Sequence, residues 1–253
     1  MEKEWPKLNP PPIVEAVFCV DFAGLPALTK KSAAALMQNV DSRYAESVDL
    51  VSQSLTFDMS SADKEVRPEV SWRGMRFLSG KSDVVVLSNM SAQIVRLAYS
   101  RLPPYMSWAS FIGTARSILE KFIAGVRVDP VVKRLGVRYV NHLPVTDKSI
   151  PLADVISCVP SDPKGITGIV SRDFFYRDTS HYDEYDLDAT LVRSAGRNGA
   201  GESVIVVDAD VFSCPDVEVS KVKWDSLLER THNLKNALFF GTVAEKSYKG
   251  LVK

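Results

Sequence analysis

The segment RLGVRYVN, residues 134–141, combines the alternation of a β-strand with an unusual number of polar side chains. Residues two apart in a strand share a face, so Leu135, Val137 and Tyr139 point to one side of the predicted sheet. Gly136 and Arg138 point to the other side. The segment therefore predicts a strand with one apolar face and one face that carries a positive charge.

An arginine on a sheet face is tolerated only when a carboxylate, a backbone carbonyl or an anionic ligand compensates its charge. Glu15 lies in a strand predicted at residues 13–22 and is the candidate partner of Arg138. Such a pair would have a structural role and would tie two parts of the sheet together. The alternative is that Arg138 belongs to an anion or ligand site.

The rest of the chain divides into strand-like and helix-like runs, separated by turn-forming residues. Strands are predicted at residues 13–22, 49–59, 69–79, 83–90, 92–100, 132–143, 168–178, 184–195 and 202–212. Helices are predicted at residues 26–40, 103–126 and 223–243, with a short helical stretch at 150–159. Thr29 and Ser107 are the candidate N-caps of the first two helices.

The order of these elements is strand, helix, several strands and long helix, and it occurs twice along the chain. We therefore expect an α+β fold of two similar halves, residues 1–126 and 127–253, that form one continuous unit. Each half would be an antiparallel sheet packed on a long helix. This organisation resembles the helix-grip arrangement of steroidogenic-lipid-transfer-like domains and its duplication in the TATA-binding protein.

Composition limits the classes of function. The 253 residues include 31 basic and 31 acidic side chains, so the formal net charge is zero and no overall field attracts nucleic acid or anionic lipid. The three cysteines, Cys19, Cys158 and Cys214, show no paired spacing, which argues against a disulfide framework or a zinc knuckle. No apolar run is long enough to span a membrane, and the N-terminus has no secretory signal, so we expect a cytoplasmic protein without membrane contact.

Three segments together suggest a family. NPPPIVEAVFCVDF, RLGVRYVNHL and LLERTHNLKNALFFGTV resemble, in this order, a sporadically distributed bacterial family of about this length. Such proteins have a PPIVEA-like first strand, an RxGxRYxN-like central strand and a C-terminal helix with a histidine and a phenylalanine. The resemblance implies no activity, because none is assigned to the family, and its patchy distribution implies mobile or defence-associated genes. It draws attention to Pro12, Glu15, Arg134, Gly136, Arg138, Tyr139, Asn141, His232 and Phe239.

From this set we take Glu15, Arg134, Arg138, Tyr139, Asn141 and His232 as the candidate binding or structural residues. His232 could act as a general base or a metal ligand, but no HExxH or similar spacing accompanies it. A histidine on a helix surface or in a capping network is the alternative.

Two pairs of aspartates could form a metal site. Asp186 with Asp188, and Asp208 with Asp210, each share a face of a predicted strand. If these strands are neighbours, four carboxylates could hold Mg²⁺ or Mn²⁺ and support hydrolysis of phosphodiesters or triphosphates. The alternative is that they line the solvated face of a sheet. The sequence has no P-loop, GxGxxG or GxSxG motif, so we predict no cofactor and favour a non-enzyme.

Arginines and aromatic residues are interleaved in several predicted strands. Arg73, Arg76, Tyr99 and Arg172 represent a sheet face that could contact phosphates and stack on bases. The neutral net charge instead favours ordinary cross-strand pairs, so nucleic acid is an alternative partner.

The sequence therefore predicts a non-enzymatic binding or regulatory protein, an accessory component of a bacterial defence or mobile-element system that acts through protein contacts. Exposed edge strands also favour self-pairing into a homodimer. A nucleic-acid-binding module and a metal-dependent phosphohydrolase are the two alternatives.

Overall fold

The computed structural model describes residues 5–57, 66–145, 154–157 and 174–249. The elements up to the middle of the chain are β1 (Ile13–Ala23), α1 (Lys30–Val40), β2 (Glu46–Phe57), β3 (Val66–Ser79), β4 (Asp83–Asn89), β5 (Ile94–Arg101), α2 (Trp108–Val126) and β6 (Val131–Pro144). They are followed by β7 (Phe175–Tyr182), β8 (Leu187–Arg197), β9 (Ser203–Ser213), β10 (Val217–Glu218), a 3₁₀-helix (Val219–Lys221), α3 (Trp224–Thr242) and α4 (Glu245–Tyr248).

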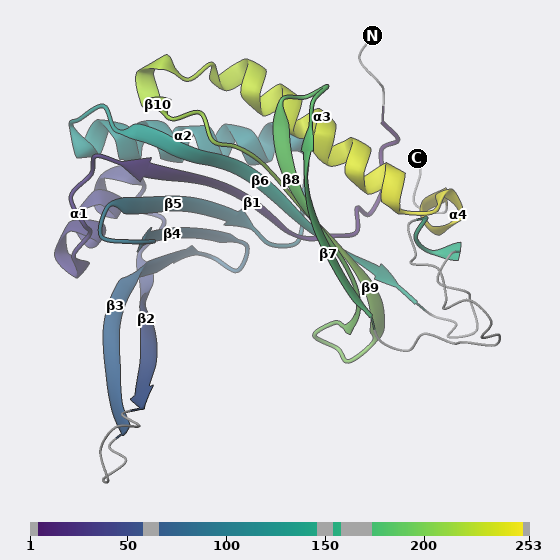
Figure 1. Ribbon diagram of the computed structural model, residues 1–253, viewed down its shortest axis with the longest axis horizontal. Helices are drawn as coiled ribbons and strands as arrows, with labels where there is room; N and C mark the ends of the chain where they lie inside the picture. Colours follow the sequence, from purple (N-terminus) through teal and green to yellow (C-terminus); the bar gives the residue numbers. More distant parts are fainter. Residues whose placement is uncertain (1–4, 58–65, 146–153, 158–173, 250–253) are drawn as a thin grey trace.

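The strands form one ten-stranded antiparallel sheet, shown in Figure 1. Its order is β2-β3-β4-β5-β1-β6-β9-β8-β7, and β10 pairs with β6. The two central strands, β1 and β6, are antiparallel neighbours from the pair Ile13 and Asn141 to the pair Ala23 and Val131. The segment RLGVRYVN thus lies in the middle of the sheet, between β1 and β9.

The predicted fold of two halves, each a sheet packed on its own long helix as in a duplicated helix-grip fold, is wrong. β5 pairs with one edge of β1, and β6 pairs with the other edge. An unpaired strand edge is unfavourable in a protein interior, and here the pairing of β1 with β6 removes two such edges and makes a single sheet. The predicted boundary after residue 126 falls at the end of α2, but the sheet and one hydrophobic core continue across it.

The helices pack on one face of the sheet. α2 contacts β5 and β1, α3 contacts β9, β6 and β8, and α1 contacts α2 and β3. The alternation predicted for RLGVRYVN is confirmed, because Leu135, Val137 and Tyr139 are buried in the core under the helices. The N-caps are confirmed as well: Thr29 forms a capping box at α1, and the Ser107 side chain accepts a hydrogen bond from the amide of Ser110 at α2.

No helix in the described part of the chain packs on the opposite face, which we call the helix-free face. Its central strands carry Arg96, Cys19, Asp21, Arg134, Arg138, Asp208 and Asp210. The predicted helical stretch at 150–159 and the first residues of the strand predicted at 168–178 fall largely outside the described residues. None of the described helices is both long and apolar enough to cross a membrane.

Candidate interaction surface on the helix-free face

Three arginines and three aspartates alternate across the four central strands of the helix-free face. The pairs are Arg96 with Asp21, Arg134 with Asp210, and Arg138 with Asp208, and their closest nitrogen–oxygen distances are 2.6, 2.7 and 2.6 Å. We call this set the arginine–aspartate row. Two of the pairs are bidentate, since Arg96 and Arg138 each donate through Nε and Nη2 to both oxygens of one carboxylate. Such forks fix the orientation of both side chains.

Arg134 explains the glycine of RLGVRYVN. Its guanidinium lies directly over Gly136, where a Cβ atom would be 2.5 Å from Nη1. The two residues that flank Gly136 in register also contact the guanidinium: Cys19 on β1 accepts a hydrogen bond of 2.9 Å, and the Phe212 ring on β9 lies 4.4 Å away. Gly136 therefore provides the space through which Arg134 reaches Asp210.

The charges of the arginine–aspartate row compensate one another. The hydrogen bonds that Arg96 donates to Asp21, and Arg138 to Asp208, are the largest cause of the raised pKa of each arginine. Burial raises the pKa of the Cys19 thiol, and this effect exceeds the opposite effect of Arg134. Cys19 is therefore protonated at neutral pH and is a poor nucleophile. One oxygen of Asp210, Oδ1, is buried without a hydrogen-bond partner among the described residues.

Glu15 is not the ion-pair partner of Arg138, so the predicted pairing is wrong. Glu15 lies opposite Val140 in register, and its charge is only a minor cause of the raised pKa of Arg138. Asp208 is the partner, because a diagonal position on β9 allows both carboxylate oxygens to face the guanidinium.

Two other predicted residues serve the core. Tyr139 is buried under the helices, and its hydroxyl lies 2.7 Å from that of Tyr105. The Asn141 side chain is buried and donates a hydrogen bond of 3.0 Å to the carbonyl of Val207 on β9. Both residues therefore hold elements together on the helix-covered side.

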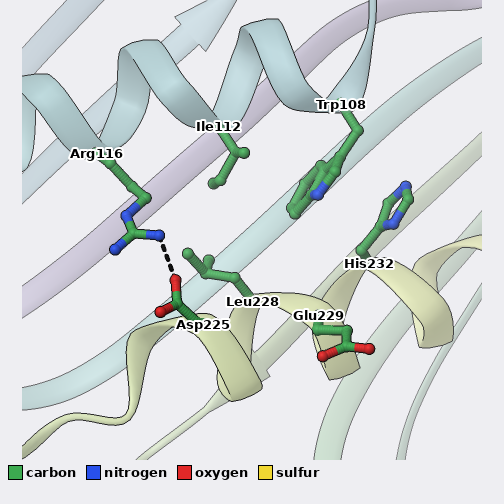
Figure 2. A pocket seen from close by; sticks show the side chains of 7 residues that line it. All are labelled: Trp108, Ile112, Arg116, Asp225, Leu228, Glu229 and His232. Atoms are coloured by element: carbon green, nitrogen blue, oxygen red, sulfur yellow. Dashed lines mark hydrogen bonds and ion pairs between the residues drawn. The ribbon is translucent and has the colours of Figure 1, made fainter.

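His232 lies in a shallow pocket between α2 and α3, shown in Figure 2. The pocket has a volume of about 180 Å³ and is lined by Trp108, Ile112, Arg116, Asp225, Leu228, Glu229 and His232. The rings of His232 and Trp108 stack with centroids 4.4 Å apart. Burial, and then the nearby Lys235, lower the pKa of His232 to about 4. At neutral pH the imidazole is therefore uncharged and acts as a stacking partner between the helices.

Sequence reasoning missed Lys235, which lies one turn after His232 on α3. Its side chain is buried, and Nζ lies 4.1 Å from the centre of the Tyr139 ring. No carboxylate pairs with it among the described residues. Burial lowers the pKa of this amine to about 7. Its position on the buried stripe of a helix was the only signal in the sequence.

The four aspartates of the predicted metal site do not gather. Asp208 and Asp210 each bind an arginine, Asp188 lies 3.0 Å from His181, and Asp186 lies 3.2 Å from Arg230 in the turn before β8. Over the described ranges, no group of three or more His, Cys, Asp and Glu side chains could hold a metal ion.

The residues predicted for nucleic acid are also dispersed. Arg76 is on the helix-free face of β3, whereas Tyr99 is buried under the helices and its hydroxyl lies 2.6 Å from the Asp83 carboxylate. Arg73 donates a hydrogen bond to Ser52 at 2.8 Å. Arg172 lies outside the described residues. Two members of the arginine–aspartate row, Asp21 and Arg96, were not among the site residues predicted from the sequence. Their signal was a charge between two apolar neighbours in a strand: Val20 and Phe22 flank Asp21, and Val95 and Leu97 flank Arg96.

Known proteins add no identification: neither the models of protein families nor the curated protein sequences contain a match to this chain.

Proposed function

We propose that this protein is a non-enzymatic binding protein that contacts a protein partner through the helix-free face of its sheet. The observation that supports this proposal is the arginine–aspartate row, in which each arginine is matched by its own carboxylate. Because the charges cancel, the row offers neither an excess of positive charge for phosphates nor free carboxylates for a metal ion. Neutral faces with fixed polar groups suit contacts with another protein surface.

The row is also continuous, which favours recognition. Asp21 is directly opposite both Arg96 and Arg134 in register, so the charges alternate from β5 to β9 without a gap. Arg138 is the most accessible member, with 47% of its side chain exposed, whereas the Asp208 side chain is only 12% exposed. A partner can therefore bind the exposed edge of a guanidinium that is already oriented.

Nucleic acid is the weaker alternative. Arg76 and Arg177 are exposed on the same face, and neither pairs with a carboxylate in the part of the chain that the structure describes. They lie on β3 and β7, near opposite ends of the sheet. Two isolated cations at this separation do not form the basic stripe that tracks a phosphate backbone.

A role in a bacterial defence or mobile-element system is part of this proposal and depends on the family resemblance alone. The same resemblance gives the membership of a sporadic bacterial family, which we keep as a proposal. The structure-based part of the proposal is the surface, and this part can be tested separately.

The test is native mass spectrometry of the protein isolated gently from its host. We expect a stoichiometric protein partner with the wild type, and its loss with Val192→Arg, since Val192 lies opposite Asp208 on the helix-free face. The matched control is Val128→Arg, at a valine that is 49% exposed in the loop between α2 and β6 and should keep the partner. Melting temperatures establish that both variants are folded. A partner that survives Val192→Arg, or a bound nucleic acid in place of a protein, would overturn the proposal.

A further inference from the structure

β2 and β3 extend beyond the body of the molecule as a two-stranded ribbon, visible at the lower left of Figure 1. They pair from Glu46 and Leu78 to Phe57 and Val66. β4 pairs with β3 only from Gly74 to Ser79, so the ribbon beyond this point has no third strand among the described residues. Isolated two-stranded ribbons are marginally stable in water, and a further strand stabilises them.

The outer edge of β2 has no partner in the part of the chain that the structure describes. The ribbon also exposes three valines, Val48, Val51 and Val70, whose exposed fractions are 55%, 59% and 63%. Long edge strands with exposed apolar side chains are sites of pairing with another chain. The opposite edge strand, β7, carries Arg177, Asp178 and His181, and charged side chains protect an edge from such pairing.

We propose that β2 is a dimerisation edge and that its partner is β2 of a second copy, paired antiparallel across a two-fold axis. A two-fold axis brings two identical edges together, so one contact satisfies both free edges and yields a closed dimer. The resulting ribbon has four strands, which exceeds the three that independent stability requires.

The charges of β2 are compatible with self-pairing. Its only charged residues, Glu46 and Asp49, lie in the first third of the strand, and the residues from Leu50 to Phe57 are uncharged. In an antiparallel pair centred near Val51, the carboxylates of each copy lie opposite the uncharged half of the other strand. Like charges therefore do not face each other. Asp49 is already compensated by Lys30 at 2.6 Å.

Sedimentation velocity of the full chain over the micromolar range tests this proposal. We expect a species of twice 28.0 kDa for the wild type. Val51→Lys should raise the dissociation constant by about tenfold or more, since the two-fold axis brings both new charges close together. Val48→Lys is a second variant on the same strand; it lies three residues from the axis, opposite the uncharged Ser54 of the other copy, so it should also weaken the dimer, but less than Val51→Lys does. Val128→Lys is the matched control, an exposed valine far from β2 in the chain, and should leave the dissociation constant unchanged.

Each outcome decides the assignment. A dimer that both β2 variants weaken and Val128→Lys does not supports the β2 edge. A monomeric wild type, or a dimer that all three variants leave intact, overturns it. So does equal weakening by all three variants, because the effect would then come from added charge alone.

Discussion

At the scale of single residues, the combination of Arg134 and Gly136 in RLGVRYVN results from one requirement: Arg134 must cross the sheet face to reach Asp210. Gly136→Ala would place a Cβ atom 2.5 Å from the guanidinium and displace it. Asp210 would then lose the partner that compensates its charge. We expect the free energy of unfolding to fall by about 1–3 kcal/mol, as measured by urea denaturation.

The matched control is Gly199→Ala, in the loop between β8 and β9, where an added Cβ atom meets nothing within 4 Å. Its effect should stay within about 0.5 kcal/mol. In an Arg134→Ala background, Gly136→Ala should lower the free energy of unfolding much less, because the added Cβ atom no longer meets the guanidinium. The effects of the two changes are therefore not additive. Additive losses would show that Gly136 is required for another reason.

At the scale of elements, local patterns predicted the strands other than β10, the three long helices, and the N-caps of α1 and α2. β6 could be predicted because its apolar and polar residues alternate, and α2 because its apolar residues repeat with helical spacing. The pairing of β1 with β6 could not be predicted, since strand order depends on contacts between residues more than a hundred positions apart. The same limit explains why Glu15 was chosen over Asp208: both are acidic residues in strands, and only the register distinguishes them.

The packing of α3 on the sheet includes an unfavourable group, the amine of Lys235. Burial lowers the pKa of this amine from its usual 10.5 to about 7, so between these values the unfolded chain binds more protons than the folded protein. Stability should therefore rise as the pH increases from about 7 to 10. Lys235→Met should stabilise the protein by about 1–3 kcal/mol near pH 7. Loss of the contact between the amine and the Tyr139 ring reduces this gain. The gain should also shrink at higher pH, where the lysine is uncharged in the folded and the unfolded chain.

Urea denaturation at several pH values measures this gain. Lys121→Met, at an exposed position on α2, is the matched control and should change stability by less than about 0.5 kcal/mol at any pH. If Lys235→Met destabilised the protein equally at all pH values, the lysine would contribute through packing or its ring contact, and its charge would carry no cost.

At the scale of the whole molecule, a single sheet and a single core predict that the two ends of the sheet lose stability together. Phe18 is fully buried at the centre of β1, so Phe18→Ala should cost about 3–5 kcal/mol. We expect the most slowly exchanging amides of β4 and of β9 to lose equal protection from hydrogen exchange in this variant. These two strands lie on opposite sides of the central pair, β1 and β6. Val17→Ala, on the other face of β1, should lower the free energy of unfolding by less, and it should again reduce the protection of β4 and β9 equally. Loss of protection in β4 alone would mean that the chain folds as separable parts, in spite of the hydrogen bonds that join β1 to β6.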